Sequence, residues 1–354
     1  MRKILILLLV IVFFAVPVSA EEIYQDYDQK IDNIVSEYDV DFDKVKQQPF
    51  ENMWQIIKNT SVKAVSKPMA VFYKILAVLI ITALINFFSF EGSKQIARFI
   101  NIISVLAVFY GVFEYFSVMA KEISDAMFNI KNFMMSFIPI FAGVSFASGE
   151  FSSSVYTGFF LVAITAVADF CVMYILPSIN LFLTVGVTAE VSSVVNLRPF
   201  CSLYTKMVKV TMTAAVSVLC FVLSLQTALS NGKDGLVLKA GKLFITSAVP
   251  IIGSGLESAV GSIYAGMGIL KGFCGIAGIT VVLSIFVPHI AILCINWFLC
   301  QMLIVLSSFF ENSSAEGILN CFKEIIEILL SICVLFLVLL IFSLTVMIKA
   351  TGVG

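Results

Sequence analysis

Long apolar segments separated by short polar ones recur along the chain after residue 68. The clearest of them are 70–90, 99–119, 155–176, 210–229 and 325–348. Each has about the 20 apolar residues that a helix needs to cross a bilayer. The pattern therefore predicts an all-α, polytopic integral membrane helical bundle of about six to eight spans.

Three further segments are ambiguous. Residues 133–147 contain Pro139 and number only about 15, which suits either a short crossing or a re-entrant segment. A crossing is favoured because it keeps the following basic loop, with Arg198, Lys206 and Lys209, in the cytosol. Pro177 is expected to end the 155–176 span, and the shorter segment 179–195 follows it. The run 276–306 contains Pro288 and predicts a kinked span or a broken pair.

The N-terminus has the pattern of a signal peptide. A basic start is followed by the apolar stretch 4–16 and by the small residues Val18-Ser19-Ala20, which predict cleavage after Ala20. An uncleaved anchor is the alternative. Either interpretation places residues 21–68 outside the cytosol.

Residues 21–68 are charged and are expected to form a short helical segment. Apolar positions recur at helical spacing at Tyr27, Ile31, Ile34, Val35 and Tyr38, and a second helix is predicted over 50–65. The charges suit a solvated face. The expected organisation is a signal peptide (1–20), an extracytoplasmic charged segment (21–68) and a polytopic membrane domain (69–354).

Composition supports this class. Of 354 residues 60% are hydrophobic and 13% charged, whereas soluble domains are about 25% charged. The net charge of -1 and the absence of a basic stripe predict no nucleic-acid partner.

Residues 250–278 hold eight of the chain's twenty glycines. Written as a helix, small side chains step by four and three residues, at Ser254, Ser258, Gly261, Ala265, Gly268, Gly272 and Gly275. This period of 3.5 keeps one seam of small residues, here called the glycine seam, facing a partner helix with left-handed crossing. Small residues allow two helices to approach closely in lipid. The alternative is a broken or re-entrant helix in which the glycines are bends.

Four charged residues within or beside apolar segments are candidates for function: Asp169, Glu190, Glu257 and Lys271. Glu257 and Lys271 border the glycine seam, and their spacing of about 21 Å along a helix prevents a direct pair. Asp169 lies mid-span, where it makes either an interhelical hydrogen bond or a coupling site. Asn296 and Gln301 are expected to bond across helices.

No catalytic motif is present. The chain lacks GxxxxGK[ST] and GxSxG, and its only histidine, His289, is interpreted as a hydrogen-bonded structural residue. The eight cysteines form no CxxC pair and are interpreted as apolar fillers rather than metal ligands. No enzyme activity, cofactor or metal is expected.

Two blocks resemble a known family. KEISDAMFNIKNFMMSFIPIFAGVSFASG (121–149) and AVPIIGSGLESAVGSIYAGMGILKGFCGIAGITVVLSIFVPHIAIL (248–293) are similar to segments of stage III sporulation protein AE. The positions in register are Phe133, Pro139, Gly149, Pro250, Gly253, Gly275 and Pro288. The order of segments also agrees, and the resemblance covers most of 68–354.

The resemblance implies a role in endospore formation. Members are encoded in an operon, lie in the mother-cell membrane around the forespore, and are thought to build a channel with ring and ATPase components and a forespore-side partner. It implies no catalytic residue. Two other classes remain: a stand-alone secondary transporter using Asp169, Glu257 and Lys271, and a structural scaffold that lines no conduit.

Overall fold

The computed structural model describes residues 20–48, 51, 54–55, 58, 66–88, 94–148, 162–191, 198–230, 253–310 and 312–349, and within them every regular element is helical. The elements are α2 (Ala20–Ser36), α3 (Phe42–Gln47), α5 (Ser66–Phe88), α6 (Lys94–Ala147), the π-helical turn η1 (Cys171–Ile175), α8 (Leu176–Val191), α9 (Arg198–Ser230), α11 (Gly253–Phe309) and α12 (Ser313–Lys349). The predicted signal peptide lies outside the described residues.

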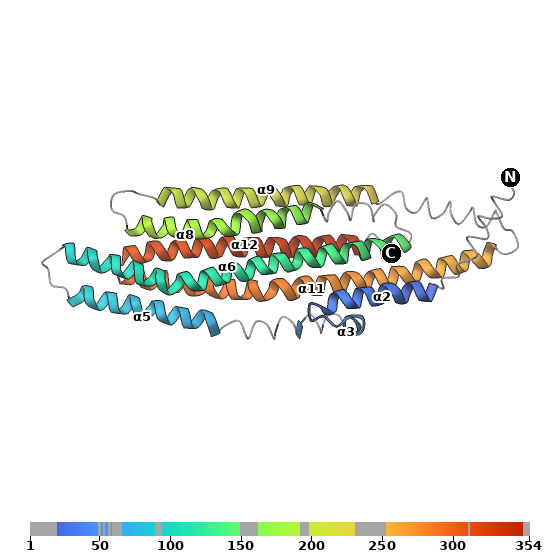
Figure 1. The fold of residues 1–354 in the computed structure, drawn as a ribbon, viewed down its shortest axis with the longest axis horizontal. Coiled ribbons are helices and arrows are strands. Elements are labelled where there is room, and N and C mark those ends of the chain that lie inside the picture. The colour runs from blue at the N-terminus through green and yellow to red at the C-terminus, as the bar shows by residue number, and fades with distance from the viewer. Residues whose placement is uncertain are drawn as a thin grey trace.

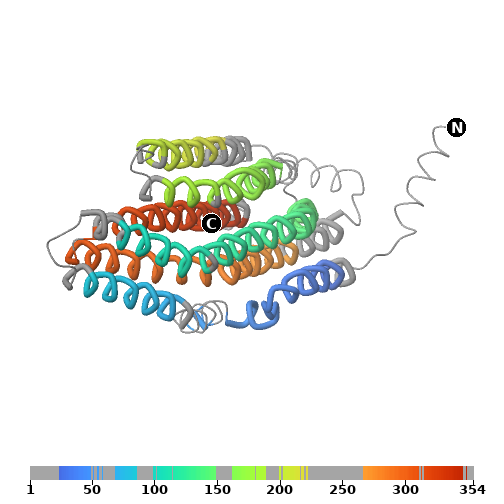
Figure 2. The backbone as a smooth tube through the Cα atoms, turned by 60° about the vertical axis from the view of Figure 1, so that its left-hand side comes forward, coloured from blue at the N-terminus to red at the C-terminus, as the bar shows by residue number. Residues whose placement is uncertain are grey.

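The helices form an elongated bundle (Figures 1 and 2). Helices α6, α11 and α12 occupy its middle, α5 and α2 lie along one side, and α8 and α9 along the other. Five helical segments of the described chain are long and apolar enough to cross a membrane: 68–85, 102–147, 162–188, 266–309 and 315–345. These findings confirm an all-helical chain with several membrane-spanning candidates.

The longest helices join segments that the sequence pattern separates. Helix α6 has 54 residues and α11 has 57, so they extend about 81 and 86 Å at 1.5 Å per residue. Residues 133–147 form the last part of α6 rather than a re-entrant segment, and α11 continues through Pro288 without a break. A proline removes one backbone donor, and neighbouring helices in an apolar setting compensate for that loss.

Two helix boundaries were predicted wrongly. The helix does not end at Pro177 but passes through it, because the π-helical turn η1 precedes the proline and the Leu176 N–H bonds the Cys171 carbonyl. The wider π turn gives the proline ring room against the preceding carbonyls. The basic residues Lys206 and Lys209 lie on α9 rather than in a loop. The predicted span 210–229 is the C-terminal part of α9, and most side chains after residue 218 lie outside the described residues.

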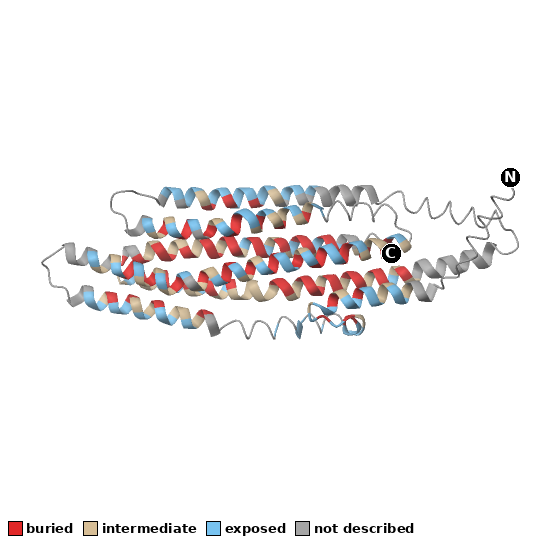
Figure 3. Ribbon diagram, viewed as in Figure 1, coloured by how far each residue is buried: buried red, intermediate tan, exposed pale blue. Residues whose placement is uncertain are grey.

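The core is a continuous apolar interior along the bundle axis (Figure 3). Phe133, Phe137 and Phe141 are each 0% exposed, and their successive ring centroids are 4.9 and 5.9 Å apart. Polar groups join the elements at the end where α5 meets α6. There the Ser104 hydroxyl accepts hydrogen bonds from Thr82 Oγ1 at 3.2 Å and from Asn312 Nδ2 at 3.0 Å.

The exposed face of α6 changes character near residue 120. In the first half the exposed large side chains are apolar: Phe99, Ile103, Leu106, Tyr110, Phe113 and Val118. In the second half exposed polar residues recur among a few apolar ones, at Lys121, Asp125, Asn129, Asn132 and Ser136. The buried face is apolar throughout most of its length. The apolar face from 99 to 118 is about 29 Å long, close to the thickness of a bilayer's hydrocarbon core.

The N-terminal segment packs on this second half of α6. Helix α2 confirms the predicted amphipathic helix, because Ile31 and Val35 are fully buried. The Tyr38 hydroxyl donates to the Asn129 carbonyl at 3.2 Å, and its ring meets Phe133 edge-on at 5.3 Å. The Tyr27 ring lies against Gly143, where an added Cβ would be 2.7 Å from the hydroxyl.

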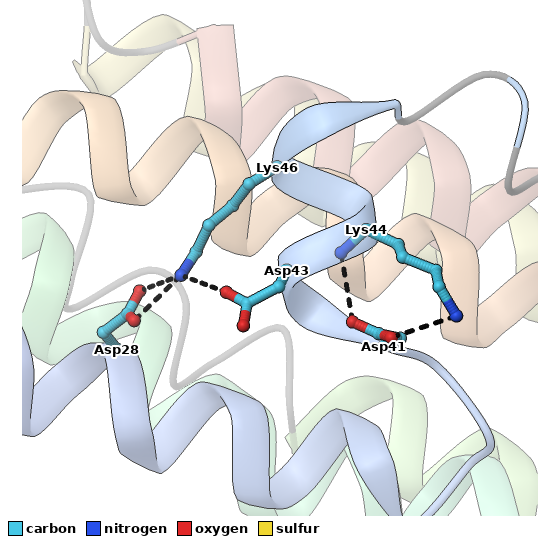
Figure 4. A network of polar contacts seen from close by, with 5 residues as sticks. All are labelled: Asp28, Asp41, Asp43, Lys44 and Lys46. Atoms are coloured by element: carbon cyan, nitrogen blue, oxygen red, sulfur yellow. Dashed lines mark hydrogen bonds and ion pairs between the residues drawn. The ribbon is translucent and has the colours of Figure 1, made fainter.

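Charged groups fasten α3 to α2 (Figure 4). Lys46 Nζ lies 2.7 Å from Asp28 and 3.3 Å from Asp43. Burial by itself would lower the pKa of Lys46, but the hydrogen bond and charge of Asp28, aided by Asp43, raise it above 10.5. Asp41 caps α3 by accepting from the Lys44 N–H at 3.0 Å.

Candidate functional site

The glycine seam lies on helix α11, as the seven-residue repeat predicts. Its first four members, from Ser254 to Ala265, are on the helix, but their side chains lie outside the described residues. At Gly268 and Gly272 an added Cβ would meet nothing within 4 Å. The seam therefore faces open space at these two positions.

The end of the seam is closed by other helices. An added Cβ at Gly275 would collide with the Ile348 side chain of α12, and one at Gly278 would lie 2.8 Å from the Phe137 ring of α6. Close helix packing of the kind predicted from small residues thus occurs inside the bundle at this end. Gly268 and Gly272 thus face open space, whereas Gly275 and Gly278 lie in close contact with other helices of the bundle.

Lys271 lies beside the seam but is buried at 0% exposure. Its Nζ is 5.7 Å from the centroid of the Phe141 ring, which places a cation near an aromatic face. The side chain of Glu257 lies outside the described residues, so its polar setting stays a prediction. Glu190 is on α8, and its side chain also lies outside them.

Asp169 pairs with a lysine of another helix. Lys131 Nζ of α6 lies 2.5 Å from Asp169 Oδ1, and the two side chains are 25% and 40% exposed. The pair lies just before η1, so the π turn and the ion pair adjoin. The interhelical bond is of the expected kind, although nothing in the sequence indicated that α6 supplies the partner.

The structure places Asp169 and Lys271 apart. Asp169 contacts Lys131, and Lys271 lies at Phe141, ten residues further along α6. Ten helical residues correspond to about 15 Å. The candidate charges of the transporter hypothesis are thus at different levels of the bundle.

A polar groove between α9 and α12 was not predicted from the sequence. Its volume is ≈ 580 Å³. It is lined by Ser202, Thr205, Lys206, Lys209, Val210, Thr213, Ala214, Ser217 and Glu324. The sequence does contain a pattern that predicts a polar helix face here, because polar residues recur at 202, 206, 209, 213 and 217 with helical spacing. Treating 198–209 as a loop hid that repeat.

Hydrogen bonds and one ion pair fix the groove's walls. Thr205 Oγ1 donates to Glu324 Oε2 at 2.8 Å, and Lys209 Nζ lies 3.2 Å from Glu327 Oε2. Trp297 Nε1 of α11 donates to the other oxygen of Glu327 at 3.4 Å. These contacts hold α9 and α12 parallel and in register.

Other polar predictions had mixed outcomes. Asn296 bonds across helices, as expected, donating to the Tyr115 hydroxyl at 2.9 Å. Gln301 Oε1 is buried with no hydrogen-bond partner among the described residues. His289 Nδ1 is 2.7 Å from the Ile285 carbonyl, so the expected hydrogen bond is present. In the part of the chain that the structure describes, no cluster of three or more His, Cys, Asp and Glu side chains has metal-site geometry.

Comparison with known proteins matches the chain to a family. The family model for stage III sporulation protein AE matches residues 37–351. No curated protein and no solved structure matches.

Proposed function

The chain belongs to the stage III sporulation protein AE family, and we propose that it is a polytopic membrane subunit of the channel complex joining mother cell and forespore. In this role it lies in the mother-cell membrane around the forespore and supports late forespore development. Its partners are the ring and ATPase components and a forespore-side channel protein. The observation that carries the proposal is the family match over residues 37–351.

The described helices suit such a subunit. Five segments are apolar enough to cross a membrane, and the glycine seam turns small side chains toward open space at Gly268 and Gly272. We propose that this open part of the seam contacts another protein of the complex, because close approach between membrane helices is what small residues permit.

The proposed organisation keeps residues 21–68 outside the cytosol. In support, α2 and α3 carry a charged surface, and α2 packs on the part of α6 whose exposed face is more polar. The signal peptide at 1–20 completes this organisation and stays a prediction.

An in-frame deletion tests the role. We expect normal vegetative growth, a fluorescent fusion that gathers around the forespore, and forespores that stall or shrink after engulfment when the protein is absent. Normal spores from the deletion strain would contradict the proposal. A growth defect in a particular medium, with normal spores, would favour the secondary transporter instead.

A further inference from the structure

We propose that the polar groove between α9 and α12 is a self-association surface on which a second copy of this chain docks side by side, both copies pointing the same way. The occupant is inferred from three properties of the described residues: the length of the polar stripe, the apolar residues that flank it, and the charges that lie level within it.

The exposed surface of α9 has one apolar face and one polar face. Apolar side chains are exposed from Phe200 to Phe221, including Leu203, Met207 and Val218, at 54% or more. The polar stripe of the groove, from Ser202 to Ser217, turns to a neighbouring face of the same helix at the same depth. Where α9 continues into the predicted span 210–229, the hydroxyls of Thr213 and Ser217 on this stripe are costly to expose to lipid unless protein or water covers them.

A lipid headgroup is too short to cover this stripe. Residues 202–217 extend about 22 Å along the helix, whereas each headgroup layer is only roughly 5–8 Å thick. A protein surface of similar length is needed. This separates a docking surface from a lysine that merely reaches the interface.

The charges of the groove make it complementary to itself. The Thr205–Glu324 hydrogen bond of 2.8 Å sets Glu324 level with the first turns of α9. Lys206 is the next residue, about 1.5 Å further along the axis. The Lys206 side chain is exposed and makes no ion pair or hydrogen bond with any described residue. A cation and an anion thus line one groove at one level.

A two-fold axis parallel to the bundle preserves these levels in both copies. Lys206 of one copy then faces Glu324 of the other, and the same contact forms a second time, as an isologous interface requires. Lys209 and Glu327 are joined within each chain at 3.2 Å and shape the rim. Lys209 and Glu327 keep this pair within each chain when the two copies dock.

Charge reversal in two differently tagged copies tests the inference. Both are expressed together in a bacterial host that does not sporulate, and co-capture is measured from detergent-solubilised membranes. Wild-type copies should capture each other. Lys206→Glu in both copies, or Glu324→Lys in both, places like charges at both contacts and should lower co-capture roughly tenfold.

The mixed pair is the decisive arm. A Lys206→Glu copy expressed with a Glu324→Lys copy has opposite charges at both contacts, so co-capture should return to near the wild-type level. A purely internal role for these residues would not be rescued in this way, since each chain still holds its own like charges. The matched control is Lys121→Glu, at an exposed lysine of α6, which should leave co-capture unchanged.

Any of three results would overturn the inference: no self-capture of the wild type, equal capture of all variants, or no recovery in the mixed pair. Membrane insertion of each variant is checked in the same samples. The inference does not rest on the proposed function, because the host has no forespore. Its failure would leave the channel role standing, and failure of the deletion experiment would leave this surface standing.

Discussion

The Lys131–Asp169 pair is the one described contact in which a predicted functional acid meets a partner of opposite charge across helices. Its side chains are 25% and 40% exposed, so its stabilisation should lie between that of a surface pair, about 0–1 kcal/mol, and that of a buried one. Lys131→Met leaves the partly buried carboxylate of Asp169 without its cation. We expect a loss of about 1–2 kcal/mol, seen as a lower melting temperature in detergent.

The double variant Lys131→Met, Asp169→Leu separates structure from coupling. Removing both charges together should restore most of the lost stability, because no uncompensated charge remains. If the pair is only structural, the double variant also sporulates normally. A stable double variant that fails to sporulate would show that the carboxylate itself is used.

Asp41 gives a prediction about pH. The hydrogen bond from the Lys44 N–H, followed by the Lys44 ammonium, holds the pKa of Asp41 below its ordinary value of 3.8. A lowered folded-state pKa means that the stabilisation is complete above 3.8 and is lost as the pH falls through the lower folded value. Amide exchange of residues 42–47, corrected for intrinsic rates, should therefore be constant near neutrality and should rise below about pH 4.

Two substitutions at Asp41 provide the controls. Asp41→Asn keeps an acceptor at the N-cap but does not titrate, so the acid-dependent rise in exchange should disappear. Asp41→Ala removes the acceptor and should raise exchange at every pH. An unchanged acid response in Asp41→Asn would assign it to another group, such as Asp28.

At the scale of single helices, α11 carries glycines in two environments, and substitution should distinguish them. Gly268→Leu with Gly272→Leu adds side chains to open space, so the chain should fold and insert normally. If the seam contacts a neighbour, the same change should abolish recovery of the protein with its complex. Co-purification from sporulating cells measures this.

Other glycines of α11 supply the controls for the seam. Gly266→Leu also enters open space but lies off the seam, and it should leave recovery of the complex unchanged. Gly275→Leu meets Ile348 within the bundle and should destabilise the chain itself. Normal complex recovery with leucine at both 268 and 272 would contradict the seam proposal.

The sequence predicted helix content and faces better than helix ends. The apolar spacing of α2 correctly placed Ile31 and Val35 in the interior. The repeat of small residues did not separate Gly275, which lies against Ile348, from Gly268 and Gly272, which face open space. Pro177 misled because a proline usually indicates a helix end, whereas the π turn before it lets the helix continue. Tertiary neighbours decide that outcome, and they are invisible in a single sequence.

Contacts between distant segments were also beyond the sequence. That Lys131 meets Asp169, or that Thr205 meets Glu324, depends on which helices are neighbours. Periodicity assigns each residue to a face but does not name the helix that the face meets. The groove between α9 and α12 was missed for a further reason. It begins within residues 198–209, which were assigned to a loop because they are basic and lie between predicted spans.

At the scale of the whole molecule, the length of α6 raises the question of where the membrane lies. The helix extends about 81 Å, more than twice the hydrocarbon core of about 30 Å. The large exposed side chains that the structure describes are apolar as far as Val118, and exposed polar residues recur from Lys121 to Ser136. The more polar part is also the part that α2 covers through Tyr27, and the turn after α2 contacts it through Tyr38. We infer that α6 crosses once, over about 99–118, and that 121–147 projects from the extracytoplasmic side.

Cysteine labelling tests this single crossing. Ile103→Cys, Leu106→Cys and Tyr110→Cys should resist a water-soluble maleimide, because thiols in lipid react slowly. Asp125→Cys, Asn129→Cys and Ser136→Cys should react when the reagent is added outside intact cells. Labelling is taken as the increase over the parent chain, since Cys294 is itself exposed.

A second crossing by 133–147 makes the opposite prediction. Positions 129 and 136 would then approach or enter the lipid, and residues just after Ala147 would be reached only from the cytosol. The burial pattern of 121–136 argues against that arrangement, because exposed polar residues recur there, whereas a helix in lipid would expose an apolar face. Met135 and Phe146 are exposed, but Asn132 and Ser136 share that surface, and the large rings of Phe133, Phe137 and Phe141 are turned into the bundle. An apolar inner face with a mixed outer face is how a helix that leaves the membrane for water is built.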